Sequence, residues 1–151
     1  MKSWRTDVHI DAPVHDVWSV LVDLPSAALW SPNARRREVT ATGPLARGTK
    51  VTMGRGRGVT TLTVGECDPP RLLRLIVAQG NSGGESVFVL HESGSTTYLE
   101  HTLHIQLRGL SRFFTFFIGR SLKSEFRRFC DRVEDHSGRA PHGETGVRET
   151  Q

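Results

Sequence analysis

One histidine of this chain lies in a strand-like segment, among apolar side chains. In the segment 96–107, alternation places five residues on one face of a strand: Leu99, His101, Leu103, Ile105 and Leu107. His101 is the ionisable group on that face. Because the unperturbed pKa of histidine lies near neutrality, His101 could act as a general acid or base in an aldol or dehydration step. The alternative is a structural histidine that is bonded to a neighbouring strand or lies at an open rim.

Arg74 is the second candidate for a chemical role. It follows the double proline and shares a strand face with Leu72 and Ile76. A buried arginine there would bind a carboxylate, an enolate or a phosphate through its fork of donors. The alternative places it on the solvated side of the sheet. Glu92 is a similar case.

Neither a metal site nor a cofactor is expected. His101 and His104 are three apart in a strand and therefore face opposite sides, so they do not form a cluster with His91. The sequence has no GxGxxG, Walker loop, HExxH or GxSxG, so nucleotide-dependent, zinc-protease and serine-hydrolase functions have no support. Cys67 and Cys130 are expected to be free thiols.

Hydrophobic periodicity predicts the elements that must position these residues. Trp4 to Ile10 alternates like a half-buried strand. Pro13 opens a helix that Asp11 or Ala12 would cap and that stops near Asp23. One further helical turn fits between the prolines that follow. Strands joined by short turns are then predicted at 35–42, 48–54, 59–67, 71–79, 85–92 and 96–107.

A long helix is predicted from Leu110 to Glu134. Its apolar residues recur every three or four positions: Leu110, Phe114, Ile118, Leu122, Phe126, Phe129 and Val133. A helix this apolar must be covered, and the preceding strands make a sheet the expected cover. The fold is therefore predicted to be α+β, with a curved antiparallel sheet of about seven strands wrapped on this helix.

Several short motifs recur in a recognisable order. VHIDAPVHDVWSVLVDLPSAALWSP combines an apolar strand, an Ala12-Pro13 helix start, a Val17-Trp18 pair and a Trp-x-Pro at its end. GPLARGTKV at 43–51 and the turns at 66–71 and 94–97 continue the pattern. Together they resemble the START-like, or Bet v 1-like, superfamily, and in particular its polyketide cyclase/dehydrase branch. The resemblance covers residues 4 to about 135.

This resemblance implies the helix-grip fold, with two short helices after the first strand and an apolar cavity between sheet and C-terminal helix. Relatives bind lipids, sterols, quinones, plant hormones or polyketides, and some cyclise or dehydrate a polyketide without a cofactor. Two functions remain open, because fold alone says little about reaction. One is a polyketide cyclase/dehydratase in which His101 and Arg74 are the polar groups. The other is a non-catalytic lipid or quinone carrier.

In this fold the short helix after the first one would place Trp30 at the cavity mouth, where the alternative is core packing. Trp18 is assigned to the core. The remaining residues expected to bind the ligand are Met53, Leu62, Glu92, Leu103, Phe114, Phe117 and Leu122.

The surface and the ends of the chain suggest partners and a location. The net charge is +4, and four basic residues would share the far side of the long helix around Phe116: Arg112, Arg120, Lys123 and Arg127. This face is either solvated or docks an acyl carrier protein, an anionic membrane or a second subunit. Nucleic acid is not expected, because stacked aromatic residues are not interleaved with these charges.

One domain is predicted at 1–136, followed by a disordered tail at 137–151. The chain could be a monomer or a homodimer. Since neither a signal peptide nor a transmembrane run is visible, the cytoplasm is the expected compartment.

Overall fold

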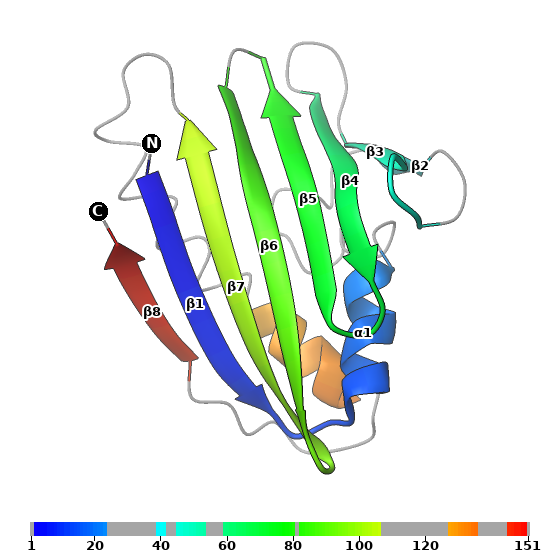
Figure 1. Cartoon of the computed structure of the whole chain (residues 1–151), viewed down its shortest axis with the longest axis vertical. Helices are drawn as coiled ribbons and strands as arrows, with labels where there is room; N and C mark the ends of the chain where they lie inside the picture. Colours follow the sequence, from blue (N-terminus) through cyan, green and yellow to red (C-terminus); the bar gives the residue numbers. More distant parts are fainter. Residues whose placement is uncertain are drawn as a thin grey trace.

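The computed structural model describes residues 2–23, 39–41, 45–53, 59–80, 82–106, 127–135 and 145–150. It confirms an α+β architecture with one antiparallel sheet (Figure 1). The strand order is β2-β3-β4-β5-β6-β7-β1-β8. The strands are β1 (Lys2–Ile10), β2 (Val39–Ala41), β3 (Lys50–Met53), β4 (Thr60–Asp68), β5 (Leu72–Gln79), β6 (Ser82–Ser93), β7 (Thr96–Gln106) and β8 (Thr145–Thr150).

The first strand joins the sheet at the far side of the meander. β1 pairs with β7 along its whole length, from Lys2 opposite Ile105 to Ile10 opposite Thr97. Its predicted alternation is confirmed, because Trp4, Thr6, Val8 and Ile10 are all exposed by 2% or less. β1 therefore brings one continuous buried row into the sheet.

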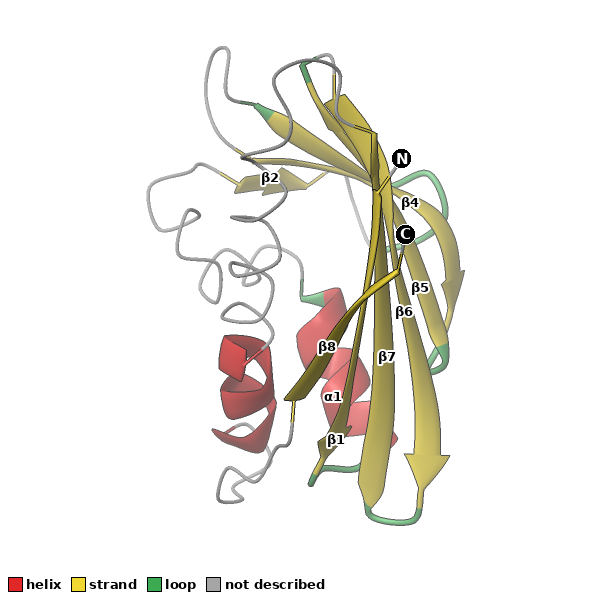
Figure 2. Cartoon of the chain, turned by 90° about the vertical axis from the view of Figure 1, so that its left-hand side faces the viewer, coloured by secondary structure: helices red, strands yellow, loops and turns green. Residues whose placement is uncertain are grey.

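Two helical segments lie on the same face of the sheet (Figure 2). One is α1 (Val14–Val22), and the other spans residues 127–135. The predicted apolar face of α1 is confirmed, and Trp18 belongs to the core. Phe129, Cys130 and Val133 of the segment 127–135 join the same core cluster. We call the sheet face that packs on these helices the inner face and the opposite one the outer face.

The start of α1 differs from the sequence-based expectation. Its N-cap is Pro13, without a capping side chain, where Asp11 or Ala12 had been expected. The carbonyl oxygen of Pro13 accepts hydrogen bonds from the backbone N–H groups of Asp16 and Val17 at 3.0 and 3.2 Å. The helix therefore begins at Val14, because Pro13 has an extended ψ of 150° although its φ of −61° is compatible with a helix.

The C-terminal prediction needs a correction. Residues 145–150, which were expected to be disordered, form β8 and pair antiparallel with β1. The physical reason is the free edge of β1, whose backbone donors and acceptors can bind a strand of almost any composition. Of the long helix predicted at 110–134, only the end is described, and the second short helix lies outside the described residues. In the described part of the chain, no helix is long and apolar enough to cross a membrane.

Candidate functional site

Antiparallel register arranges the inner face into rows that run across the strands. The first row is Thr6, His101, Phe88 and Leu73. The second row is Trp4, Leu103, Ser86, Leu75 and Val64. The third row, toward the beginning of β1, is Ile105, Gly84, Val77 and Leu62, and Lys2 of β1 lies opposite Ile105 in the register. These rows contain the candidate site.

His101 is held in the first row by contacts with two residues of β6. Its ring stacks on Phe88, with ring centroids 4.3 Å apart and planes 8° from parallel. Its Nε2 lies 2.7 Å from Oγ of Ser86, which is a hydrogen bond whose direction depends on the histidine tautomer. Both residues are buried, with exposures of 6% for His101 and 8% for Ser86. The predicted inward position of His101 is therefore confirmed, although a role in chemistry remains a prediction.

Burial changes the acid–base behaviour of this histidine. Desolvation lowers the pKa of His101 from 6.5 to about 4, because the charged imidazolium loses its hydration in the core. The ring is accordingly neutral near pH 7. A neutral imidazole offers one donor and one acceptor, and it binds polar oxygens rather than anions.

Burial decreases from the first row to the third. Leu73 and Leu75 are exposed by 0% and 5%, and both lie beneath helical side chains of the core. In the third row Ile105, Val77 and Leu62 are only half-buried. Figure 1 shows both described helices toward the end of the sheet where the β6–β7 turn lies, whereas the third row includes Gly84 and Ile105 near the opposite ends of β6 and β7. Apolar side chains that face inward but keep solvent access are typical of a surface that receives a ligand.

Arg74 does not belong to this site. Leu73 and Leu75 point into the core, so Arg74 lies on the outer face with Ile76, which is 47% exposed. Its guanidinium donates to Glu85 of β6, with Nη2 3.1 Å from Oε2. This bond raises the pKa of Arg74 further. The expectation that Arg74 joins His101 in the cavity is corrected by strand alternation, which sends the two side chains to opposite faces.

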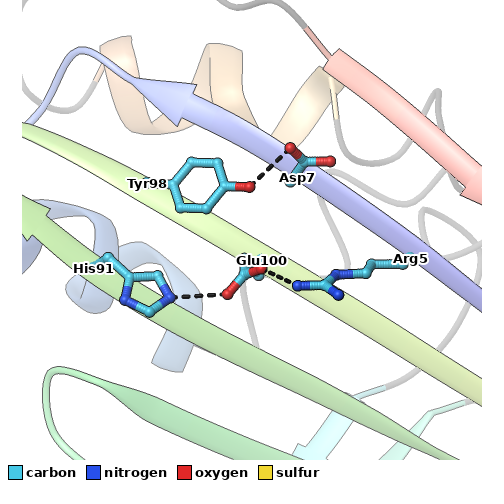
Figure 3. Close-up of polar contacts among 5 residues, drawn as sticks. All are labelled: Arg5, Asp7, His91, Tyr98 and Glu100. Carbon is cyan, nitrogen blue, oxygen red and sulfur yellow. Dashed lines mark hydrogen bonds and ion pairs between the residues drawn. The ribbon is translucent and has the colours of Figure 1, made fainter.

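The outer face carries a second polar network, drawn in Figure 3. Glu100 of β7 binds Arg5 of β1 on one side and His91 of β6 on the other, where Nε2 lies 2.8 Å from Oε2. Hydrogen bonds from His91 and Arg5 hold the pKa of Glu100 below its ordinary value. Beside them, the Tyr98 hydroxyl donates to Asp7 at 2.8 Å, which raises the pKa of Tyr98. These pairs join neighbouring strands on the face that carries no described helix.

The remaining predicted residues divide into three groups. Leu62 and Leu103 lie on the inner face and are half-buried. Glu92 is exposed near the β6–β7 turn and does not approach His101 along the strand. Outside the described side chains fall Trp30, Met53, Phe114, Phe117 and Leu122.

Sequence reasoning missed Ser86 and Phe88, two residues of β6 that contact His101. The signal was present, since alternation along β6 puts Gly84, Ser86, Phe88 and Leu90 on one face. It also missed Glu134, a carboxylate that is 1% exposed on the segment 127–135. Within the described ranges, no group of three or more His, Cys, Asp or Glu is placed to hold a metal ion.

Solved structures share this fold at low sequence identity. A START superfamily protein from Mycobacterium smegmatis superposes with a TM-score of 0.67 at 18% identity, covering 89% of this chain and 99% of its own. CalU16 from Micromonospora echinospora gives 0.65 at 21% identity, covering 92% and 69%. Norcoclaurine synthase from Thalictrum flavum gives 0.63 at 13% identity, covering 87% and 92%. No curated protein sequence matches this chain.

A family model matches most of the sequence. It covers residues 1–138, and hence the sheet from β1 to β7, α1 and the helical segment 127–135. The buried polar pair and the half-buried third row both lie within this range. The chain therefore belongs to the family described as polyketide cyclase / dehydrase and lipid transport.

Proposed function

We propose that the protein binds a hydrophobic small molecule on the inner face of its sheet, over the third row and next to Ser86. The observation that carries this proposal is the gradient of burial across the rows. Leu73 and Leu75 are packed in the core, whereas Val77, one step further along the same strand face, is half-buried. An apolar face that continues beyond the two described helical segments gains free energy when a ligand covers it, at about 25 cal/mol per Å².

Membership of the family supports the same function. The family description names polyketide cyclisation, dehydration and lipid transport, all of which handle large apolar molecules. The START superfamily protein from Mycobacterium smegmatis shares the fold of this chain, with a TM-score of 0.67. The family description and the shared fold both support a protein that binds hydrophobic ligands.

A cofactor-independent cyclase or dehydratase is the second candidate, and the convergence of His101 and Ser86 favours it. Two polar groups inside an apolar face can orient a keto group and polarise its carbonyl. With a pKa of about 4, His101 is a weak base, so its contribution would be hydrogen bonding rather than proton abstraction. A carrier needs no such pair beyond recognition of its ligand.

Binding is tested with the neutral fluorophore Nile red and by native mass spectrometry of the purified protein. The decisive comparison uses two isoleucines, one on each face. Ile105→Glu puts a charge into the third row and should weaken Nile red binding by at least about tenfold. Ile76→Glu puts the same charge on the outer face and should leave binding unchanged. Equal effects of both changes would refute the proposed location.

Catalysis is tested separately with a carrier-tethered poly-β-keto substrate. Turnover that falls in Ser86→Ala and His101→Ala, while Nile red still binds, would support the cyclase. If the wild-type protein bound Nile red but did not turn over the substrate, the result would support a non-catalytic carrier.

An acyl carrier protein stays a predicted partner of the last helix. Of the basic residues assigned to its far side, Arg127 is described and exposed, as is its neighbour Arg128. Both charges are available to an acidic surface. Reversal of the two charges should abolish any binding of acyl carrier protein that the wild-type chain shows.

A further inference from the structure

The geometry points to Ser86 as the residue that selects the ligand: we infer that its hydroxyl, polarised by His101, binds a hydroxyl or keto oxygen of a neutral, ring-containing ligand. This inference rests on the proposed function and specifies the chemistry of that same site. Ser86 lies in the second row and is 8% exposed, at the boundary between the packed core and the half-buried third row. A polar group at that boundary is the first one that a ligand covering the third row would meet.

The bond between Ser86 and His101 leaves the serine able to bind a second oxygen. A serine hydroxyl has one donor and two acceptor positions, and His101 uses one of them. If Nε2 accepts from Ser86, the serine oxygen still accepts from a ligand hydroxyl. If Nε2–H donates to Ser86, the serine O–H still donates to a ligand ketone. In either tautomer of His101, the serine hydroxyl can therefore bind one oxygen of the ligand.

Gly84 adds no side chain to the third row. Next to Ser86 on the same face of β6 is Gly84, which stands between Val77 of β5 and Ile105 of β7. A Cβ at Gly84 would lie 2.3 Å from the carbonyl oxygen of His104, so this position has to remain without a side chain. Strands β5 and β7 are two strand spacings apart, about 10 Å. We place the ring of the ligand over Gly84, between the two flanking side chains, with its oxygen directed to Ser86.

Electrostatics favour a neutral ligand. The described neighbours of Ser86 on this face, namely His101, Phe88, Leu103 and Leu75, carry no charge near pH 7, because His101 has a pKa of about 4. An anion bound by Ser86 would lose hydration without gaining a counter-charge from these neighbours. The inferred ligand is therefore a phenol, an alcohol or a ketone built on a ring rather than a free carboxylate.

The test uses two ligands of nearly equal shape, 1-naphthol and 1-methylnaphthalene, and a third, 1-naphthoate. In the wild-type protein 1-naphthol should bind about tenfold more tightly than 1-methylnaphthalene, which is the effect of one made or missed hydrogen bond in a buried place. The anion 1-naphthoate should bind more weakly than 1-naphthol. Isothermal titration or intrinsic naphthalene fluorescence measures all three dissociation constants.

Two variants locate the effect. Ser86→Ala should reduce the ratio of the two affinities to about one and leave 1-methylnaphthalene binding within about threefold of wild type. Thr97→Val removes another buried hydroxyl, one that donates to the Ala12 carbonyl at 2.8 Å, and should leave the tenfold ratio intact. Circular dichroism and thermal unfolding confirm that both variants fold.

The outcomes separate the two proposals. If both naphthalenes bind the wild-type protein equally well, the ligand site stands and the assignment of Ser86 is overturned. A ratio that persists in Ser86→Ala also overturns it, because another group must then bind the oxygen. If neither compound binds, the proposed function itself fails, and the inference fails with it.

Discussion

Nε2 of His101 reaches Oγ of Ser86 diagonally, because His101 lies opposite Phe88 in the β6–β7 ladder and Ser86 lies opposite Leu103. The parallel ring of Phe88 holds the imidazole plane, so the direction of Nε2 follows from the register of two strands. A site held by strands is positioned more rigidly than one held by a loop. Its energetic consequences can be measured before any ligand is known.

The first prediction concerns stability and pH. Burial sets the pKa of His101 at about 4 in the folded protein, against 6.5 for an exposed histidine. Between these values the unfolded chain binds a proton that the folded chain does not. Titration of His101 therefore costs no stability above the unfolded pKa, and the free energy of unfolding decreases as the pH falls from the unfolded pKa toward the folded pKa. We expect a loss of about 3 kcal/mol in the free energy of unfolding between about pH 7 and about pH 4.

Urea unfolding of the wild-type protein and of His101→Phe measures this contribution. The variant has no titrating group at this position, so its unfolding free energy should fall less steeply over the same interval. If the unfolding free energies of the two proteins changed equally with pH, His101 would not be the cause of the pH dependence. The difference in slope, rather than the absolute stability, is the quantity of interest.

A second prediction follows from the hydrogen bond itself. Ser86→Ala should lower the free energy of unfolding by about 1–3 kcal/mol, since it removes the hydroxyl that binds Nε2 in a buried place. In a His101→Phe background the same change should cost about 1 kcal/mol less, because that bond is already absent. Thr97→Val is the matched control. It lies four residues from His101 along β7, about 13 Å away, so its cost should add to that of His101→Phe.

The alternation of side chains made much of the inner face predictable from sequence. In β1 and β7 one set of alternate residues is clearly more apolar, so the inward direction of Thr6 and His101 follows from strand period alone. β5 differs, because Leu72, Leu73, Leu75 and Ile76 make both of its faces apolar. Its inner face is decided by pairing with Phe88 and Ser86 of β6, which no pattern within β5 reveals. For that reason Arg74 could not be assigned to a face in advance.

Long-range pairing also limits prediction of the site and of the last strand. Ser86 and His101 are 15 residues apart, and their contact depends on the register of the β6–β7 hairpin. β8 depends on an open edge of β1 at the other end of the chain. Residues 145–150 are mostly polar, and they pair with β1 through backbone groups, which the amino-acid composition does not reveal.

Gly84 provides a third prediction, with a control one residue away. A Cβ at Gly84 would approach the His104 carbonyl oxygen to 2.3 Å, whereas one at Gly83 would lie 3.5 Å from the Val77 carbonyl oxygen. Gly84→Ala should therefore lower the free energy of unfolding by at least about 1 kcal/mol, because the backbone of β6 or β7 must move to accommodate the new Cβ. Gly83→Ala should be near neutral or slightly stabilising, since it restricts the unfolded chain. Equal thermal midpoints for the two variants would contradict the close approach of β6 and β7.

The outer network offers a fourth prediction, of a small effect. Glu100→Gln removes the carboxylate that binds Arg5 and His91. Because the side chains of Arg5 and His91 are each more than half exposed, we expect a loss of less than about 1 kcal/mol at neutral pH and no change in ligand affinity. The pKa of Glu100 is lowered in the folded state, so its contribution is present above the ordinary carboxyl pKa and disappears as the pH falls through the lowered value. A large loss of stability, or weakened Nile red binding, would contradict this assignment of the outer face.

The last prediction uses the two free thiols, Cys67 and Cys130. Burial, reinforced by the charges of Glu134 and Asp131, raises the pKa of Cys130 to about 12. At pH 8 about one molecule in ten thousand then carries the reactive thiolate at this position. Cys67 is half-buried, with a pKa that burial also raises.

Ellman's reagent should therefore label Cys67 first in the native protein and Cys130 only after the segment 127–135 opens or the chain unfolds in urea. Cys67→Ser isolates the slow reaction, and Cys130→Ala should leave the fast one unchanged. If native Cys130 reacted as quickly as Cys67, the segment 127–135 could not be packed on the sheet as described. Because Cys130 shares its core cluster with Phe129 and Val133, its labelling rate measures how often the helical cover leaves the inner face.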